Sequence, residues 1–134
     1  MHPLFPRADQ LSKEVIGACI EVHRIKGPGL IESIYERCLM RELALLGLPA
    51  VNQRQVLIEY KGIVFEECLR FDVLVEGCLL LELKAIEKVL PIHKAKTLSY
   101  MKLLDVPLGL IVNFHELKLV DGICRLILPG ANQP

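Results

Sequence analysis

Three residues that could do chemistry together lie in the middle of the chain: Asp72, Glu82 and Lys84. Glu82 and Lys84 interrupt the apolar run LLLELKAI, where burying either charge without a partner costs several kcal/mol. The turn signal EG at positions 76–77 predicts a hairpin, and its register places Asp72 close to Glu82. The period of two along a strand puts Glu82 and Lys84 on one face. The sequence therefore predicts two carboxylates and one amine at one place.

This set of side chains suits a divalent metal ion. Mg²⁺ takes hard oxygen ligands and keeps some of its waters, so Asp72, Glu82 and the backbone carbonyl of Leu83 could hold it. The metal would acidify a bound water and neutralise a phosphodiester. Lys84 could orient that water or stabilise the transition state. The competing explanation is structural, a salt bridge from Lys84 to Glu82 or Asp72, and the three residues alone leave both open.

The elements that must position these residues follow from periodicity and breakers. Pro3 and Pro6 predict a flexible arm over residues 1–8, and Asp9 or Ser12 can cap the first helix. KGPG at 26–29 ends that helix, and the KG and EG pairs mark strand turns. The predicted order is αα-βββ-α-ββ in one domain over 9–128 with a tail at 129–134. The later elements are a helix at 30–46, strands at 53–60, 63–75 and 78–86, a helix at 92–104, and strands at 107–114 and 123–128.

Composition bounds the class of protein. The chain has 134 residues, 52% of them hydrophobic, which fits one folded domain rather than a disordered segment. Lys plus Arg and Asp plus Glu number 16 each, so a non-specific nucleic-acid coat protein is disfavoured. The five cysteines show no metal-ligand spacing and are expected to be small buried hydrophobes in a reducing compartment. We expect a cytoplasmic protein without a signal peptide or membrane span.

Two stretches flank the three central residues. GLIESIY at 29–35 places Glu32 and Tyr35 on one helical face, and HKAKTLSYMK places Lys96 and Tyr100 four residues apart. Tyr35 could hydrogen-bond a site carboxylate or pack with its hydroxyl in water. Five lysines between positions 84 and 102 oppose one acid, Glu87, which predicts a surface that follows phosphates. A solvated helix face is the alternative for this lysine run.

Taken together, these motifs resemble the PD-(D/E)XK nuclease superfamily, and more narrowly its GxxExxY family. The likeness runs from about residue 11 to 127 through VHRIKGPGLIESIYE, FDVLVEG, LELKAIEKVLPIHKA and GLIVNF. It implies an α/β fold of restriction-endonuclease type, with a mixed central sheet flanked by helices and the site where the hairpin strands splay. A nuclease of DNA, or less readily of RNA, is the implied activity, with Mg²⁺ or Mn²⁺ as cofactor.

The resemblance also assigns roles. Asp72 and Glu82 would be metal ligands, Lys84 the catalytic lysine and Glu32 a further acid near the metal. We expect nucleic-acid contacts from the following helix and the loop before it, by Lys88, Lys94, Lys96 and Tyr100. Lys96 departs from the pattern, because related exonuclease-like members carry Gln at this position. A lysine there could contact a phosphate, or pair with Glu32 or Glu82 and displace the metal.

Two other functions stay open at this point. The first is a catalytically silent binding module for nucleic acid or protein that keeps the fold, which Lys96 and the neutral net charge favour. The second is a homodimeric interaction protein that pairs through an apolar sheet edge or its first helices.

Overall fold

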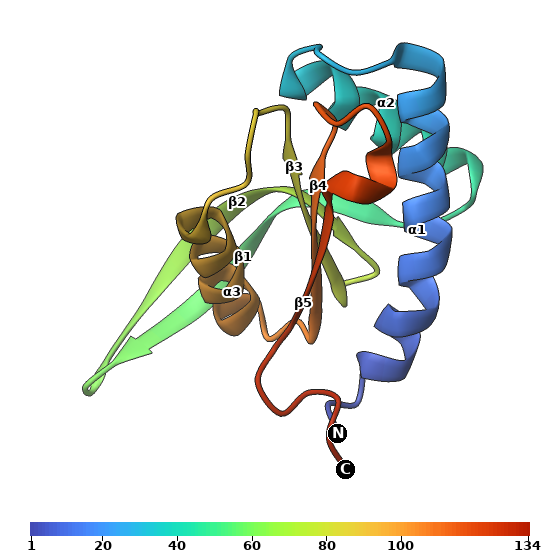
Figure 1. The fold of residues 1–134 in the computed structure, drawn as a ribbon. Coiled ribbons are helices and arrows are strands. Elements are labelled where there is room, and N and C mark those ends of the chain that lie inside the picture. The colour runs from blue at the N-terminus through green and yellow to red at the C-terminus, as the bar shows by residue number, and fades with distance from the viewer.

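The computed structural model describes all residues 1–134. Figure 1 shows a central sheet with helices on both faces, which confirms the predicted α/β architecture and the predicted order of elements. The helices are α1 (Phe5–Lys26), α2 (Glu32–Leu45), α3 (Pro91–Leu104) and the 3₁₀ turn η1 (Leu119–Gly122). The strands are β1 (Ala50–Tyr60), β2 (Ile63–Val75), β3 (Leu79–Lys84), β4 (Leu108–Asn113) and β5 (Ile123–Ile127).

The five strands lie in the order β1-β2-β3-β4-β5, with β3 in the middle. The β3–β4 pair is parallel and the other pairs are antiparallel, so the sheet is mixed. Both predicted hairpin turns form at an X-Gly pair whose two residues have positive φ, at 61–62 and 76–77. Glycine takes that conformation without strain, which is why these short turns can join twisted antiparallel strands.

Two apolar layers hold the sheet between the helices. Leu79, Leu81 and Leu83 of β3 pack in the larger cluster, which includes the buried faces of α1 and α2. Leu80 points to the other face, where it packs with Met101 of α3. The middle strand is therefore covered on both faces, as its apolar sequence predicts, and the even-numbered residues of β3 face α3.

Helix α3 packs closely on the sheet at a glycine. A Cβ atom added to Gly109 of β4 would lie 2.7 Å from the sulfur of Met101. The missing side chain at Gly109 therefore sets how near α3 can approach. This distance matters for function because α3 carries Lys96 and Tyr100 over the face that also bears Glu82.

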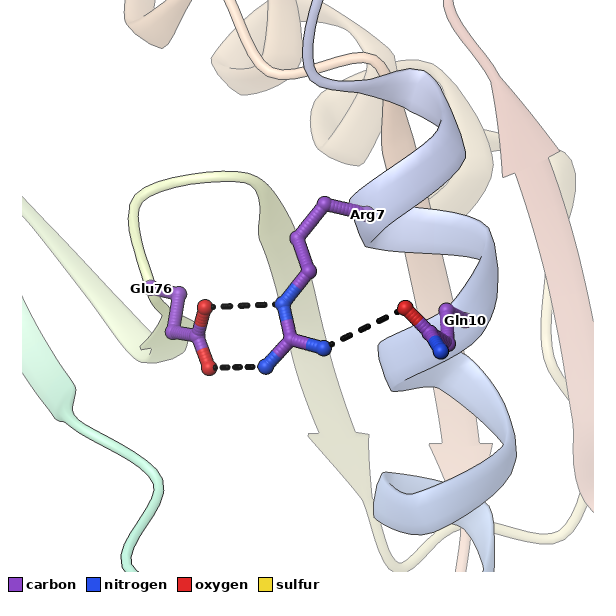
Figure 2. A network of polar contacts seen from close by, with 3 residues as sticks. All are labelled: Arg7, Gln10 and Glu76. Atoms are coloured by element: carbon purple, nitrogen blue, oxygen red, sulfur yellow. Dashed lines mark hydrogen bonds and ion pairs between the residues drawn. The ribbon is translucent and has the colours of Figure 1, made fainter.

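The first helix begins at Phe5, so the predicted irregular arm is wrong for residues 5–8. Proline fits the first turn of a helix because its missing N–H has no partner there, and Pro6 occupies such a position. Ala8 is fully buried. Arg7 reaches the β2–β3 turn, where its guanidinium donates to both carboxylate oxygens of Glu76 at 3.0 and 2.7 Å, and to Gln10 at 3.4 Å (Figure 2). The first turn of α1 therefore anchors the hairpin that carries Asp72.

The hairpin of β1 and β2 projects beyond the body of the molecule as a two-stranded arm (Figure 1). We call residues 53–60 and 63–70 the β-ribbon. Its register pairs Ile58 with Phe65 and Tyr60 with Ile63, which places these four side chains on one face. Ile63 is 60% exposed although its neighbours on this face are apolar. The ribbon thus presents an uncovered apolar face.

The cysteines are all free, and only some of them are buried. Cys19 and Cys78 are in the core, and burial raises the pKa of Cys19 to about 12. Cys68 is exposed on the β-ribbon, which corrects the expectation that every cysteine is a buried hydrophobe. No helix is both long enough and apolar enough to cross a membrane.

Candidate active site

The strands β2 and β3 separate beside Asp72. Their regular pairing ends at Val73 opposite Leu81, one residue short of the position where Asp72 would face Glu82. Instead, the Asp72 carboxylate accepts the backbone N–H of Leu83 at 2.7 Å. The Asp72 side chain thereby takes the place of the β2 backbone as the partner of Leu83. The two strands of the hairpin separate here, as predicted.

On its other edge, β2 bulges against β1 at the same residues. Between the pairs Val51–Leu74 and Gln53–Arg70, β1 has one intervening residue and β2 has three, at 71–73. Extra residues on one strand leave the ladder locally unpaired and redirect side chains, and such bulges are common beside active sites. The sequence pattern did not reveal this bulge, because strand alternation continues on both sides of it.

Glu82 and Lys84 lie together on the α3 face of β3. The Lys84 ammonium is 3.6 Å from a Glu82 carboxylate oxygen, which is the ion pair that the sequence offered as the structural alternative. Glu82 is only 8% exposed. Because the pair is largely buried, removing either side chain would leave the other charge uncompensated inside the protein.

The electrostatics of the two central carboxylates are unfavourable for ionisation. Burial is the main cause that raises the pKa of both Asp72 and Glu82. Glu32 raises the pKa of Asp72 further, and the Asp72 charge does so for Glu82, while Lys84 and Lys96 act in the opposite direction. Two close carboxylates that resist ionisation would be stabilised by an added cation.

Helix α2 brings two acids toward Asp72. Glu32 is its first residue, an exposed position where the helix dipole favours a negative charge. Glu36 lies one turn later, and its pKa is raised by burial and then by repulsion from Asp72 and Glu32. Glu36 was not among the predicted site residues, although its spacing of four residues from Glu32 is a signal for a shared helical face.

Tyr35 neither bonds a site carboxylate nor places its hydroxyl in water, so both predictions for it are wrong. Its side chain is completely buried, and its ring stacks on Phe114 with centroids 4.3 Å apart. The hydroxyl donates to the carbonyl of Gly27 at 2.6 Å and accepts the N–H of Leu30 at 3.0 Å. The tyrosine of the GLIESIY motif thus fixes the α1–α2 turn that delivers Glu32.

The lysines predicted to contact nucleic acid divide between two places. Lys96 lies close enough to Asp72 and Glu82 to lower their pKa, yet it forms no ion pair with Glu32 or Glu82. Its ammonium sits 5.8 Å from the centre of the Tyr100 ring instead. Lys88 and Lys94 line a separate hollow of about 180 Å³, together with three acids, Glu87, Glu116 and Asp121.

Other polar residues near the sheet have structural partners. The His23 ring nitrogen Nε2 donates to the Glu116 carbonyl at 2.7 Å. The His93 ring accepts the N–H of Leu90 at 2.9 Å, which caps α3. The buried Asn113 amide donates to the Ile86 carbonyl at 2.8 Å and accepts the Ile86 N–H at 3.1 Å, which ties β4 to the segment after β3.

The donors around Asp72 fit a divalent metal of the hard type. In an extended strand the N–H and C=O of one residue point to the same side, so the Leu83 carbonyl faces the same gap as the Leu83 N–H that Asp72 accepts. Two carboxylates and this carbonyl are all oxygen donors, which Mg²⁺ and Mn²⁺ prefer. No group of three acidic, histidine or cysteine side chains is placed to hold a metal. A metal here would need the carbonyl and waters to complete its shell.

Comparison with known proteins adds one positive finding. The model of the PD-(D/E)XK nuclease superfamily matches residues 9–126, which include every residue of the candidate site. Enzymes of this superfamily typically use divalent metal ions. Searches of curated proteins and of solved structures found no match.

Proposed function

Because the chain belongs to the PD-(D/E)XK nuclease superfamily, we propose that it is a metal-dependent nuclease that hydrolyses phosphodiester bonds of DNA. The observation that carries this proposal is the opening of the β2–β3 pair at Asp72, beside Glu82 and Lys84. The two carboxylates and the Leu83 carbonyl lie around this gap, next to the Lys84 amine. We also propose that the chain is a member of the GxxExxY family, on the strength of GLIESIY at 29–35.

We propose that Asp72, Glu82 and the Leu83 carbonyl hold Mg²⁺ or Mn²⁺. When bound, the metal would supply a more acidic water and neutralise phosphate charge. Lys84 is placed to hold the attacking water or to stabilise charge on the phosphate, once its contact with Glu82 loosens. Glu32 and Glu36 would orient waters around the metal from α2.

Nucleic-acid binding is assigned to the α3 side of the site. Lys96, held against Tyr100, is near enough to the carboxylates to meet a phosphate that flanks the scissile bond. Lys88 and Lys94 would contact the backbone farther along, although their acidic neighbours reduce that attraction. A cytoplasmic location is part of the proposal, and the five free thiols support it.

The test is a cleavage assay on single- and double-stranded DNA and RNA with Mg²⁺, Mn²⁺ or EDTA. We expect cleavage of DNA with metal, loss of cleavage in Asp72→Asn and Lys84→Met, and no loss in Lys118→Met, an exposed lysine outside the site. Isothermal titration of Mn²⁺ on wild type and Asp72→Asn measures the metal site directly. Metal binding without cleavage of any substrate would contradict the nuclease proposal.

A silent binding module is the second candidate, and one observation favours it. Lys84 already neutralises Glu82 at 3.6 Å, so the gap carries less negative charge than two free carboxylates would. Such a module would retain nucleic acid in a salt-dependent manner and would bind no Mn²⁺. The Mn²⁺ titrations of wild type and Asp72→Asn therefore distinguish a nuclease from a silent binding module before any substrate is known.

We further propose that the protein forms a homodimer through the apolar face of the β-ribbon. An isolated two-stranded ribbon is marginally stable in water, and this one leaves Tyr60, Ile63 and Phe65 exposed. If two ribbons pack face to face and antiparallel, Lys61 at the tip of one would lie near Glu67 at the base of the other. Zero net charge adds no long-range repulsion between copies.

A further inference from the structure

A hollow between α1 and α2 has features of a ligand site and is separate from the candidate active site. Its volume is about 320 Å³, and its floor is formed by Val22 and Ile25 of α1 and Cys38 of α2. We call it the α1–α2 hollow. Neither Asp72 nor Glu82 lines it. Pockets that bind small molecules are mostly apolar, begin at about this size, and carry a few polar groups that orient the ligand.

Three cations surround this apolar floor: Lys26, Arg37 and Arg41. None of them takes part in any of the five ion pairs of the structure. Glu42 is the only acid of the lining, and it too forms no ion pair. The rim therefore carries a net charge of +2 (three cations and one anion), in a protein whose total formal charge is zero.

The arrangement of these cations is unfavourable without a counter-ion. Arg37 and Arg41 are four residues apart on α2, where like charges destabilise a helix by about 0.2–0.5 kcal/mol. Lys26 faces them from the last turn of α1. A bound anion would offset this repulsion, and arginine offers paired donors that match carboxylate or phosphate oxygens.

The floor and the rim together select the class of ligand. An inorganic anion would satisfy the cations but leave Ile25, which is 57% exposed, in contact with water. A neutral apolar molecule would cover the floor but leave the cations uncompensated. The volume corresponds to about ten water molecules, which is room for a short chain with one charged head.

We propose that the α1–α2 hollow binds a small organic anion, with its carboxylate or phosphate head on Arg37, Arg41 and Lys26 and an aliphatic body on Val22 and Ile25. This site is independent of the nuclease proposal, since it shares no residue with the metal site. Binding would join the end of α1 to α2 and so stabilise the helix pair that packs on the sheet.

The test uses Cys38, which lines the hollow, and Cys68, which is exposed on the β-ribbon. Alkylation of each thiol by iodoacetamide is followed by mass spectrometry, with Cys68 as the internal control. We expect octanoate or octyl phosphate to slow alkylation of Cys38 and not of Cys68. The preferred head identifies which anion the site takes. Inorganic phosphate and octanol should protect Cys38 only weakly.

Matched variants locate the charge requirement. Arg41→Gln should raise the octanoate concentration needed for protection by about tenfold, because a charge-assisted hydrogen bond is lost. Arg24→Gln is the control, since Arg24 is already paired with Glu21 and does not line the hollow. Equal protection by octanol, no protection of Cys38 by either organic anion, or the same loss in Arg24→Gln would overturn the proposal. So would protection by an oligonucleotide but not by octanoate.

Discussion

The Asp72 carboxylate accepts the backbone N–H of Leu83 at 2.7 Å, and this bond replaces a missing strand pair in the centre of the sheet. The same carboxylate is proposed to bind metal through its other oxygen. Asp72 therefore has a structural role, the bond to Leu83, that needs no ligand, and a proposed functional role that requires a bound metal. Variants that keep or remove the acceptor separate the two.

We predict that Asp72→Ala lowers the free energy of unfolding by about 1–3 kcal/mol, because the partly buried Leu83 N–H loses its acceptor. Asp72→Asn keeps an acceptor oxygen and should be at least as stable as wild type. Both should lose Mn²⁺ binding. Urea unfolding and calorimetric titration measure the two effects. Equal stability of the two variants would show that the Leu83 bond contributes nothing.

The pH dependence of stability should show that ionisation of Asp72 is unfavourable in the folded protein. Its pKa is raised above the ordinary value of 3.8, so the folded chain holds the proton more tightly than the unfolded chain does. Stability from this group is present at low pH and is lost as the pH rises through the raised value. Asp72→Asn removes that loss. The free energy of unfolding of Asp72→Asn should therefore exceed that of wild type most at neutral pH, and the difference should disappear as the pH falls to 3.8. An advantage that grows on acidification would contradict the assigned direction.

Tyr35→Phe should destabilise the protein. The change removes the bonds to the Gly27 carbonyl and the Leu30 N–H while the stacking on Phe114 remains. Loss of these buried partners should cost about 1–3 kcal/mol in thermal or urea unfolding. Tyr60→Phe is the matched control at a protein concentration too low for the proposed dimer, because Tyr60 is exposed on the β-ribbon and loss of its hydroxyl should change little.

Lys96→Gln tests the lysine that stands where the resemblance predicts Gln. Lys96 repels a cation placed between Asp72 and Glu82, so its removal should increase Mn²⁺ affinity a few-fold. The same change should weaken DNA binding and reduce its salt dependence. Lys102→Gln, a lysine of the same helix that does not affect these carboxylates, is the control. Reduced metal affinity in Lys96→Gln would mean that this lysine supports the site instead.

The two faces of the β-ribbon give a matched test of dimerisation. Ile63 lies on the apolar face, whereas Leu57 pairs with Glu66 on the opposite face and is 73% exposed. We expect light scattering to find a concentration-dependent dimer that Ile63→Lys abolishes and Leu57→Lys preserves. A monomer at every concentration, or equal sensitivity to both changes, would contradict the proposed interface.

Features that depend on neighbours in the chain were determined by the sequence. The turns at 61–62 and 76–77 need only a glycine and its preceding residue, so both hairpins were predicted correctly. The period of two placed Glu82 and Lys84 on one face, and the apolar run around them predicted a central strand. These patterns follow from backbone geometry, which requires no knowledge of distant elements.

Features that depend on distant contacts were decided by the tertiary structure. The bulge at Asp72 arises from the alignment of β1 with β2, and the burial of Tyr35 depends on Phe114, far along the chain. The uncovered face of the β-ribbon and the α1–α2 hollow likewise follow from where the helices stop. An apolar alternation looks the same in sequence whether or not another layer lies above it. Only the packing of the whole chain determines which side chains are covered and which remain free to bind.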